Sequence, residues 1–351
     1  MLNIYIVYSF KRIMEIRRIQ VTGGSSYIIS LPKPWITACN IQKGDPIAII
    51  HQADGSLLIT PKISSEHSYS KKIISVENIH DSKYLIRMLI GSYIMGYSEI
   101  QIKSSEKIPP HVQAAVVDFT HTSIGFEVID ENNYAITLKD LLNPVEMPFA
   151  KTIKRMYLIA EEMFKSAIDS LKAIDISLAE SVIQRDKEID RLYWLVNRQL
   201  NLVLTDITLS YKMETNSNEA LYYFLISKAL ERIGDHAVRI AENIRQLEKV
   251  TFSDEDAKLI SESGEFAIKF LSDAIDSWIM RDVARANNTI DGLSNIIENY
   301  EKLNKIAKKM KNINESIAVS YIAESIQRVG EYSADIGEVV VDFLMKKNES
   351  K

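Results

Sequence analysis

Two pairs of carboxylates in the second half of the chain have a spacing that could hold a metal ion. Asp186 and Asp190 are four residues apart, and so are Glu231 and Asp235. In a helix this spacing places both members of a pair on one face, with about 5–6 Å between their Cβ atoms. Two such pairs near a core would need a cation to compensate their charge. Oxygen ligands suit Mg²⁺, Mn²⁺ or iron, and zinc is also possible.

Carboxylates are common in this chain, so a single pair at this spacing indicates little. Asp and Glu account for 47 of the 351 residues, and a solvated helix face is the usual explanation of one pair. The apolar residues from Ile226 to Leu247 recur every three or four positions, and Glu231 and Asp235 lie on the border of this stripe. Both pairs also belong to an internal repeat, which favours the metal interpretation.

The internal repeat is visible in two motifs of the second half of the chain. IDRLYWLV at 189–196 matches IDGLSNII at 290–297, and ERIGDHAVRIAE at 231–242 matches QRVGEYSADIGE at 327–338. Gly234 and Gly330 occupy the same repeat position, which indicates a close approach of helices or room for a ligand. The repeat predicts two units of one architecture, over 148–248 and 254–346.

The second copy of the repeat has fewer carboxylates at the corresponding positions. Asn287 and Gln327 stand where the first copy has Asp186 and Glu231. A second metal site is therefore expected to be weaker than the first. Its candidate ligands are Asp291, Glu331 and Asp335.

The elements that position these residues follow from the distribution of proline. All eight prolines lie at or before Pro148, and proline interrupts helices. After Pro148 the apolar spacing predicts helices joined by short polar links, which favours antiparallel bundles of three helices. The predicted helices cover 148–173, 176–211, 217–248, 254–281, 283–311 and 314–346.

The first part of the chain predicts two smaller modules. Residues 70–147 alternate strand and helix patterns and contain no glycine-rich phosphate loop, as expected of an α+β module. Residues 14–63 predict a compact β unit with a short helical turn and a closing hairpin at Asp54-Gly55. A β unit this small buries little surface alone, so we expect it to dimerise.

Charge and cysteine content limit the partners and the compartment. Residues 1–63 carry seven Lys or Arg against three Asp or Glu, whereas the whole chain has a net charge of −5. A basic head on an acidic body is compatible with a nucleic-acid partner at that end. The single cysteine, Cys39, predicts no internal disulfide, and we expect it to be buried. We expect a cytoplasmic protein without membrane insertion, with Met1 or Met14 as its start.

No pattern in the chain indicates catalysis. No nucleophile lies in a recognisable constellation, and His236 does not follow a glutamate by three residues, as it would in di-iron carboxylate enzymes. A lone helical histidine of this kind is more often a packing residue than a ligand. We therefore predict that the protein is not an enzyme.

The two helix motifs carry a resemblance to a known family. DKEID followed by ALERIGDHAVRIAENI, with a second copy ending in QRVGEYSADIGEVV, closely resembles the PhoU family of phosphate-uptake regulators over about 148–346. The resemblance implies two three-helix bundles and multinuclear iron or zinc clusters. It also implies the ligands Asp186, Asp190, Glu231 and Asp235 in the first bundle, and Asp291 and Glu331 in the second.

A second resemblance covers the basic head. Residues 15–62 resemble the SpoVT/AbrB swapped-hairpin DNA-binding domain, through Gly24, Leu31-Pro32-Lys33, Lys43-Gly44-Asp45 and the hairpin at Asp54-Gly55. The combination with PhoU repeats is similar to an arrangement of phosphate regulators found in archaea. The resemblance implies a homodimer that offers basic residues to DNA. The candidate contacts are Arg17, Arg18, Ser25, Ser26 and Lys33.

Together the patterns and the two resemblances imply a multi-domain fold, with an all-β swapped-hairpin head, an α+β middle module and an all-α part of two repeated three-helix bundles. The function that the resemblances imply is negative transcriptional control of phosphate transport, with metal on the helical repeats and DNA on the head. One alternative is a protein that acts on a phosphate transporter or sensor kinase, with a head that only dimerises. Another is a di-metal carboxylate enzyme.

Overall fold

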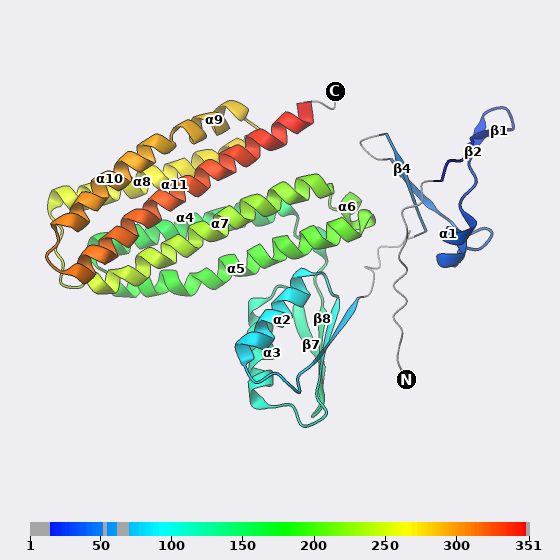
Figure 1. Ribbon diagram of the computed structural model, residues 1–351, viewed down its shortest axis with the longest axis horizontal. Coiled ribbons are helices and arrows are strands. Elements are labelled where there is room, and N and C mark those ends of the chain that lie inside the picture. Colours follow the sequence, from blue (N-terminus) through cyan, green and yellow to red (C-terminus); the bar gives the residue numbers. More distant parts are fainter. Residues whose placement is uncertain (1–14, 52–54, 62–69, 349–351) are drawn as a thin grey trace. The chain divides into compact units, whose positions relative to one another are not determined.

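The structure is a computed structural model that describes residues 15–51, 55–61 and 70–348. The chain divides into two units, residues 1–65 and 66–351. The first unit is the head, and the second contains the middle module and the helical part (Figure 1). The predicted fold class is confirmed: a small β region, an α/β middle and a mostly helical remainder.

The head consists of two short antiparallel hairpins and one helix. β1 (Gln20–Thr22) pairs with β2 (Ser26–Ile28), and β3 (Ala48–His51) pairs with β4 (Leu57–Thr60). α1 (Lys33–Ala38) lies between the hairpins in sequence. The turn between β1 and β2 places Gly23 and Gly24 at positive φ, where glycine is favoured. Asp54 of the predicted closing turn lies outside the described residues.

None of the described head residues is buried in a single copy of the chain. Large apolar side chains are exposed instead, among them Ile19, Val21 and Tyr27. The expectation that Cys39 is buried was wrong, because α1 has no core to pack against and Cys39 is exposed.

The middle module has the element order that the sequence predicted. The elements are β5 (Lys71–Ser75), α2 (Ser82–Ile94), β6 (Glu99–Lys103), α3 (Pro110–Thr122), β7 (Phe126–Glu131) and β8 (Ala135–Asp140). The sheet order is β5-β6-β8-β7, with β5 and β6 parallel and the other pairs antiparallel. Leu89, Ile102 and Phe119 are fully buried between the sheet and the helices.

The other face of the sheet carries charges of alternating sign across the strands. The register aligns Lys71 with Glu99, Glu99 with Lys139, and Lys139 with Glu127. Opposite charges in directly paired positions stabilise a sheet, and Lys71 Nζ lies 2.8 Å from Glu99 Oε1. This face is therefore polar, and the core of the module lies on the helical side.

The helical part begins after a 3₁₀ turn, η1 (Pro144–Glu146). The first repeat contains α4 (Phe149–Ala173), α5 (Ile176–Thr205), α6 (Ile207–Lys212), α7 (Ser217–Ile244) and the 3₁₀ turn η2 (Arg245–Leu247). The second repeat contains α8 (Asp254–Met280), α9 (Val283–Asp291), α10 (Leu293–Lys309) and α11 (Ile313–Asn348).

Two of the predicted helices are each interrupted. The helix expected over 176–211 ends at Thr205, because Asp206 caps a new helix by accepting hydrogen bonds from the backbone of Thr208 and Leu209. The helix expected over 283–311 is broken at Gly292. A Cβ atom at Gly292 would lie 2.6 Å from Phe270 Cε2, so glycine permits this close approach.

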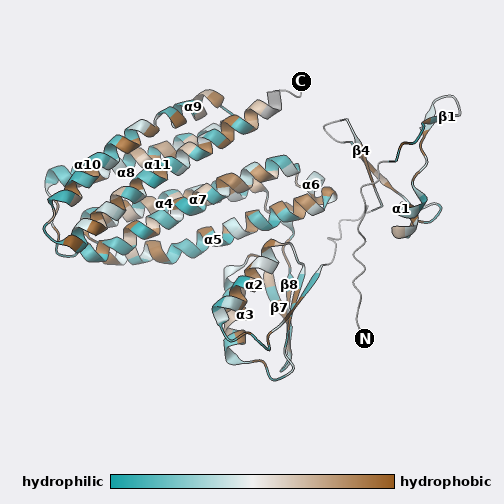
Figure 2. Ribbon diagram, in the orientation of Figure 1, coloured by the Kyte–Doolittle hydropathy of each residue, from teal (hydrophilic) through white to brown (hydrophobic). Residues whose placement is uncertain are grey.

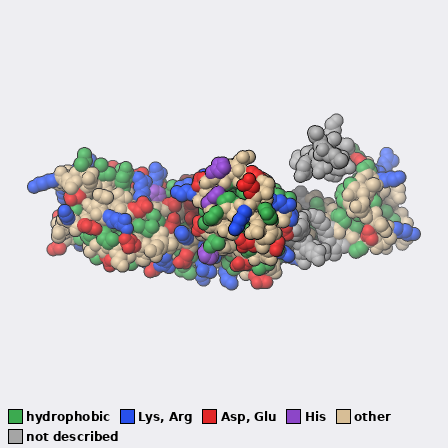
Figure 3. Space-filling view, turned by 90° about the horizontal axis from the view of Figure 1, so that it is seen from below, with side chains coloured by type: hydrophobic (Ala, Val, Ile, Leu, Met, Phe, Trp, Pro, Cys, Tyr) green, Lys and Arg blue, Asp and Glu red, His purple; other side chains and the backbone are tan. Residues whose placement is uncertain are grey.

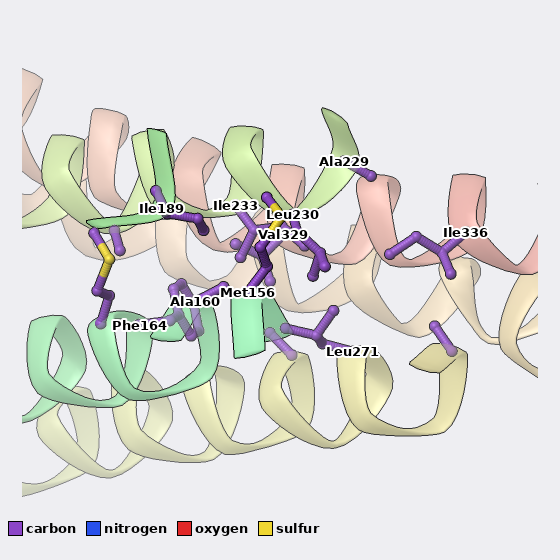
Figure 4. Close-up of a cluster of buried hydrophobic side chains, with 14 of the residues drawn as sticks. Met156, Ala160, Phe164, Ile189, Ala229, Leu230, Ile233, Leu271, Val329 and Ile336 are labelled. Atoms are coloured by element: carbon purple, nitrogen blue, oxygen red, sulfur yellow. The ribbon is translucent and has the colours of Figure 1, made fainter. Parts of the chain in front are cut away.

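The two repeats share one continuous hydrophobic core. In each repeat three long segments pack together, α4, α5 and α7 in the first and α8, α9–α10 and α11 in the second. α7 and α11 then pack against each other in antiparallel directions, because Tyr222 contacts Phe343 at one end and Arg239 pairs with Glu324 further along. Figure 4 shows core side chains from both repeats, including Leu230 and Val329.

The surface of the helical part is polar between these packed faces. In Figure 2 each long helix alternates hydrophobic and hydrophilic residues along its length, as expected of an amphipathic helix. On the face shown in Figure 3, acidic, basic and apolar side chains are interspersed.

The two repeat glycines are sites of close helix packing, and this predicts unequal effects of substitution. A Cβ atom at Gly330 would lie 2.6 Å from Ile296 Cγ2, whereas one at Gly234 would lie 3.1 Å from Ile189 Cγ2. We expect Gly330→Ala to destabilise the protein by about 1–2 kcal/mol, because the clash exceeds the gain in helix propensity.

Urea unfolding of Gly330→Ala and Gly234→Ala measures this difference, and Gly234→Ala is expected to be closer to neutral. In the double variant Gly330→Ala/Ile296→Ala the clashing side chain is truncated, so the loss in free energy of unfolding should be smaller than the sum of the two single losses. A Gly330→Ala protein as stable as the wild type would contradict the prediction.

Candidate functional site

The packing of α5 against α7 brings the two predicted carboxylate pairs together. Asp186 and Asp190 lie on α5, and Glu231 and Asp235 lie on α7. The missing side chain of Gly234 allows the two helices to approach, and the position of its Cβ would be 3.8 Å from Asp186 Oδ1. Asp186 Oδ1 is buried and has no hydrogen-bond partner among the described residues.

The electrostatics of this carboxylate cluster favour protonation of its members. Burial raises the pKa of Glu231 to about 7, and the nearby charge of Asp235 contributes. Burial raises the pKa of Asp190 to about 6, with further contributions from Asp186 and Asp235. The pKa of Asp186 is raised by burial and then by Asp235 and Glu242.

One arginine partly compensates the cluster. Arg232 Nη1 lies 3.3 Å from Asp235 Oδ2, and Arg232 Nε lies 3.7 Å from Glu231 Oε2. Burial raises the pKa of Asp235, and Arg232 lowers it. The cluster therefore carries more negative charge than its basic neighbour neutralises.

The chemistry of these four side chains fits a hard or borderline cation. All of them are carboxylates, burial raises the pKa of each, and one buried oxygen has no partner. Within the part of the chain that the structure describes, no three His, Cys, Asp or Glu side chains are arranged as a ligand set. Rotation of the side chains would be needed to bring the oxygens onto one ion.

In the second repeat, one candidate ligand, Glu331, is held by other side chains. Glu331 accepts a hydrogen bond from Gln327 Nε2 at 2.7 Å and pairs with Arg328 at 2.7 Å. Burial raises the pKa of Asp335, followed by the charges of Glu338 and Glu331. Asp291 is exposed near the end of α9. A weaker second site stays a prediction.

The five predicted DNA contacts are all exposed on the head, and they are Arg17, Arg18, Ser25, Ser26 and Lys33. Ser25 lies in the turn between β1 and β2, Ser26 begins β2, and Lys33 begins α1. The Arg17 side chain pairs with Glu15. The structure leaves the five side chains accessible and does not show what they contact.

Sequence reasoning missed one buried charged residue, Arg198 on α5, that joins the middle module to the helical part. Its guanidinium donates to the backbone oxygens of Tyr93 and Tyr97, and it pairs with Asp140 Oδ2 at 2.6 Å. It also lies over the ring of Phe126, 5.3 Å from the centroid. The sequence feature that could have identified this residue is its position within the apolar stripe of α5, because a charged side chain is rarely buried unless it is paired.

In comparison with known proteins, the helices that carry the carboxylate cluster match the model of a protein family. The model of the PhoU domain matches residues 153–244, which include α5, α7, nearly all of α4, and all four carboxylates. These helices form a PhoU domain. The model of the antidote-toxin recognition family MazE, a bacterial antitoxin, matches residues 20–66. The predicted swapped-hairpin type of the head is thereby confirmed.

Curated PhoU relatives align with slightly more than half of the chain. A protein from Thermotoga maritima is 26% identical over 203 residues, which cover 56% of this chain and 85% of the relative. One from Zymomonas mobilis is 24% identical over 188 residues, which cover 52% of this chain and 77% of the relative. Both are described as phosphate-specific transport system accessory protein PhoU homologues.

The crystal structure of PhoU from Pseudomonas aeruginosa is also similar to this chain. It has 19% sequence identity and a TM-score of 0.49, and the alignment covers 57% of this chain and 96% of that one. No helix in the described residues has an apolar stretch of the length that a bilayer crossing requires.

Proposed function

We propose that this PhoU-family chain is a non-catalytic accessory regulator of phosphate transport. The observation that carries the proposal is the PhoU domain match over the helices that hold the carboxylate cluster. The names of its relatives support the same role, since they are accessory proteins of phosphate-specific transport systems.

Phosphate uptake in a strain that lacks the gene tests this role. If the chain restrains uptake, the deletion strain should take up labelled phosphate faster than the parent when phosphate is abundant. The wild-type gene should restore the parental rate. Equal uptake in the parent and the deletion strain would contradict the proposal.

We also propose that the carboxylate cluster binds a metal ion, with iron, zinc, Mn²⁺ or Mg²⁺ as candidates. Asp186, Asp190, Glu231 and Asp235 would hold the ion, which would supply the positive charge that Arg232 provides only in part. The unpartnered Asp186 Oδ1 and the raised pKa values support this assignment.

Elemental analysis of protein purified without chelators tests the metal proposal. We expect Asp186→Asn/Asp235→Asn to lose the bound metal, because two of the four anionic ligands are neutralised. The matched control is Asp291→Asn/Glu331→Gln in the second repeat, which should retain most of it. Unchanged metal content in the first variant would refute the ligand assignment.

For the head we propose a homodimer that binds DNA. The exposed apolar side chains of β1 to β4 support dimerisation, since a surface patch of this kind is usually covered by a partner. The exposed basic residues at Arg17, Arg18 and Lys33 support contacts to DNA phosphates.

Two measurements on the full chain separate dimerisation from DNA binding by the head. Light scattering measures the oligomeric state, and a salt series measures the affinity for DNA. DNA affinity should fall with the logarithm of salt concentration, and Arg17→Ala/Arg18→Ala should reduce that slope by about 2 per protomer. A dimer that binds no DNA at low salt would favour the alternative, a head that only dimerises and a chain that acts on a phosphate transporter or sensor kinase.

A further inference from the structure

A groove between α7 and α11 is open on the surface of the helical part. Its volume is about 460 Å³. Leu225 and Ala229 of α7 and Ile336 of α11 form an apolar floor, and Lys228 and Asp335 lie on opposite walls. An apolar floor between charged walls is typical of a recognition groove.

The internal repeat provides a counterpart of this groove for comparison. Residues 231 and 327 correspond, an offset of 96, so the positions of Leu225, Lys228 and Asp335 correspond to those of Tyr321, Glu324 and Arg239. In the counterpart, Arg239 Nη2 lies 3.3 Å from Glu324 Oε2. The same guanidinium lies 4.5 Å from the centroid of the Tyr321 ring. Arg239 therefore covers the apolar surface there.

In the open groove the two charges are exchanged relative to the counterpart: Lys228 stands at the position of Glu324, and Asp335 at the position of Arg239. The two side chains do not cover the apolar surface of the groove. Neither Lys228 nor Asp335 forms an ion pair within the described residues, and aspartate is too short to cover the floor as Arg239 does. Leu225 remains 38% exposed. Leu221, one turn earlier on α7, is 44% exposed and extends the apolar strip beyond the cavity.

We propose that the open groove binds an acidic amphipathic helix of a partner protein. Helices dock in grooves of this kind through apolar residues on successive turns, and the strip from Leu221 to Ala229 has this spacing. Lys228 lies on the same helix as this strip, forms no ion pair within the described residues, and favours acidic side chains beside the apolar stripe. Arg232, four residues further along α7, already pairs with Glu231 and Asp235 and is not needed for this preference. The proposal requires neither metal, DNA nor phosphate control.

Titration of the full chain with fluorescent synthetic helices tests the proposal. One helix of about 16 residues carries leucines on one face and glutamates beside them, and its control has lysines in place of the glutamates. We expect the acidic helix to bind at least about ten-fold more tightly than the basic one. Lys228→Glu should weaken the acidic helix, whereas Glu324→Gln in the counterpart groove should not.

A transplant of the closed arrangement gives a second test. Leu225→Tyr/Lys228→Glu/Asp335→Arg introduces the tyrosine, glutamate and arginine that close the counterpart groove and should reduce binding by about ten-fold or more, with the helical circular dichroism unchanged. Equal binding of the two helices, no binding of the acidic one, or no effect of the transplant would overturn the proposal. So would self-association that Leu225→Glu abolishes, because the occupant would then be a second copy of the chain.

Discussion

Replacement of Arg198 by methionine is expected to lower the free energy of unfolding by about 3–5 kcal/mol. The Arg198 side chain is 4% exposed and its partner Asp140 is 9% exposed. Removal of the guanidinium leaves a buried carboxylate without its cation and takes one donor from each of two backbone oxygens, of which Tyr93 O still accepts from Gly96 N. An unpaired buried charge is much less favourable than either the pair or an apolar replacement of both.

Urea unfolding of Arg198→Met, Asp140→Asn and the double variant measures this coupling. The double variant should be more stable than the sum of the single effects predicts, because the Asp140→Asn change removes the buried charge that Arg198→Met leaves unpaired. Arg198→Lys should recover little of the stability that Arg198→Met loses, since one ammonium group cannot reach two carbonyls and a carboxylate in the geometry of the guanidinium. Lys187→Ala, an exposed change on the same helix, is the control. An Arg198→Met protein of wild-type stability would contradict the prediction.

Neutralisation of Glu231 should stabilise the metal-free protein at pH 8, by about 1–2 kcal/mol after allowance for partial solvation. Burial and Asp235 raise the pKa of Glu231 to about 7 in the folded chain, from an ordinary value of 4.5. Between these pH values the folded state holds a proton that the unfolded state has lost. Stability from this group is therefore lost as pH rises from about 4.5 to about 7.

The comparison of Glu231→Gln with the wild type isolates this effect from other titrations. Burial lowers the pKa of His236 to about 4, so its contribution has the opposite sign and is lost as pH falls below about 6.5. The stability difference between the two proteins should be near zero at pH 4.5 and reach a plateau above pH 7. Thermal unfolding in chelator measures it, with Glu188→Gln on the exposed side of α5 as the control. A difference that does not depend on pH would refute the prediction.

Local patterns in the sequence were sufficient for the element order and for the helices that carry the carboxylates. The strand and helix order of residues 70–147 and the two repeated bundles are confirmed because each follows from the periodicity of neighbouring residues. The breaks at Asp206 and Gly292 were missed. A capping aspartate and a glycine against Phe270 are distinguished from ordinary helix residues only by their three-dimensional neighbours.

The candidate site could be predicted from the sequence only where its residues are close together along the chain. The spacing of Asp186, Asp190, Glu231 and Asp235 identified the faces that meet, and the structure brings these faces together. The contacts of Arg198 could not be derived, since its partners lie 58 and more residues away in the sequence. The charge reversal between the two grooves could be recognised only after α7 and α11 were known to pack side by side.

The Arg198 contacts also restrict how this protein can evolve by exchange of segments. A recombination that replaced residues 70–147 and kept α5 would separate Asp140 from the arginine that neutralises it. Such a hybrid would inherit a buried charge without its partner unless both positions came from the same parent. The middle module and the first helical repeat are therefore expected to be inherited as one segment, and chimeras joined after α5 should be more stable than chimeras joined at Pro148.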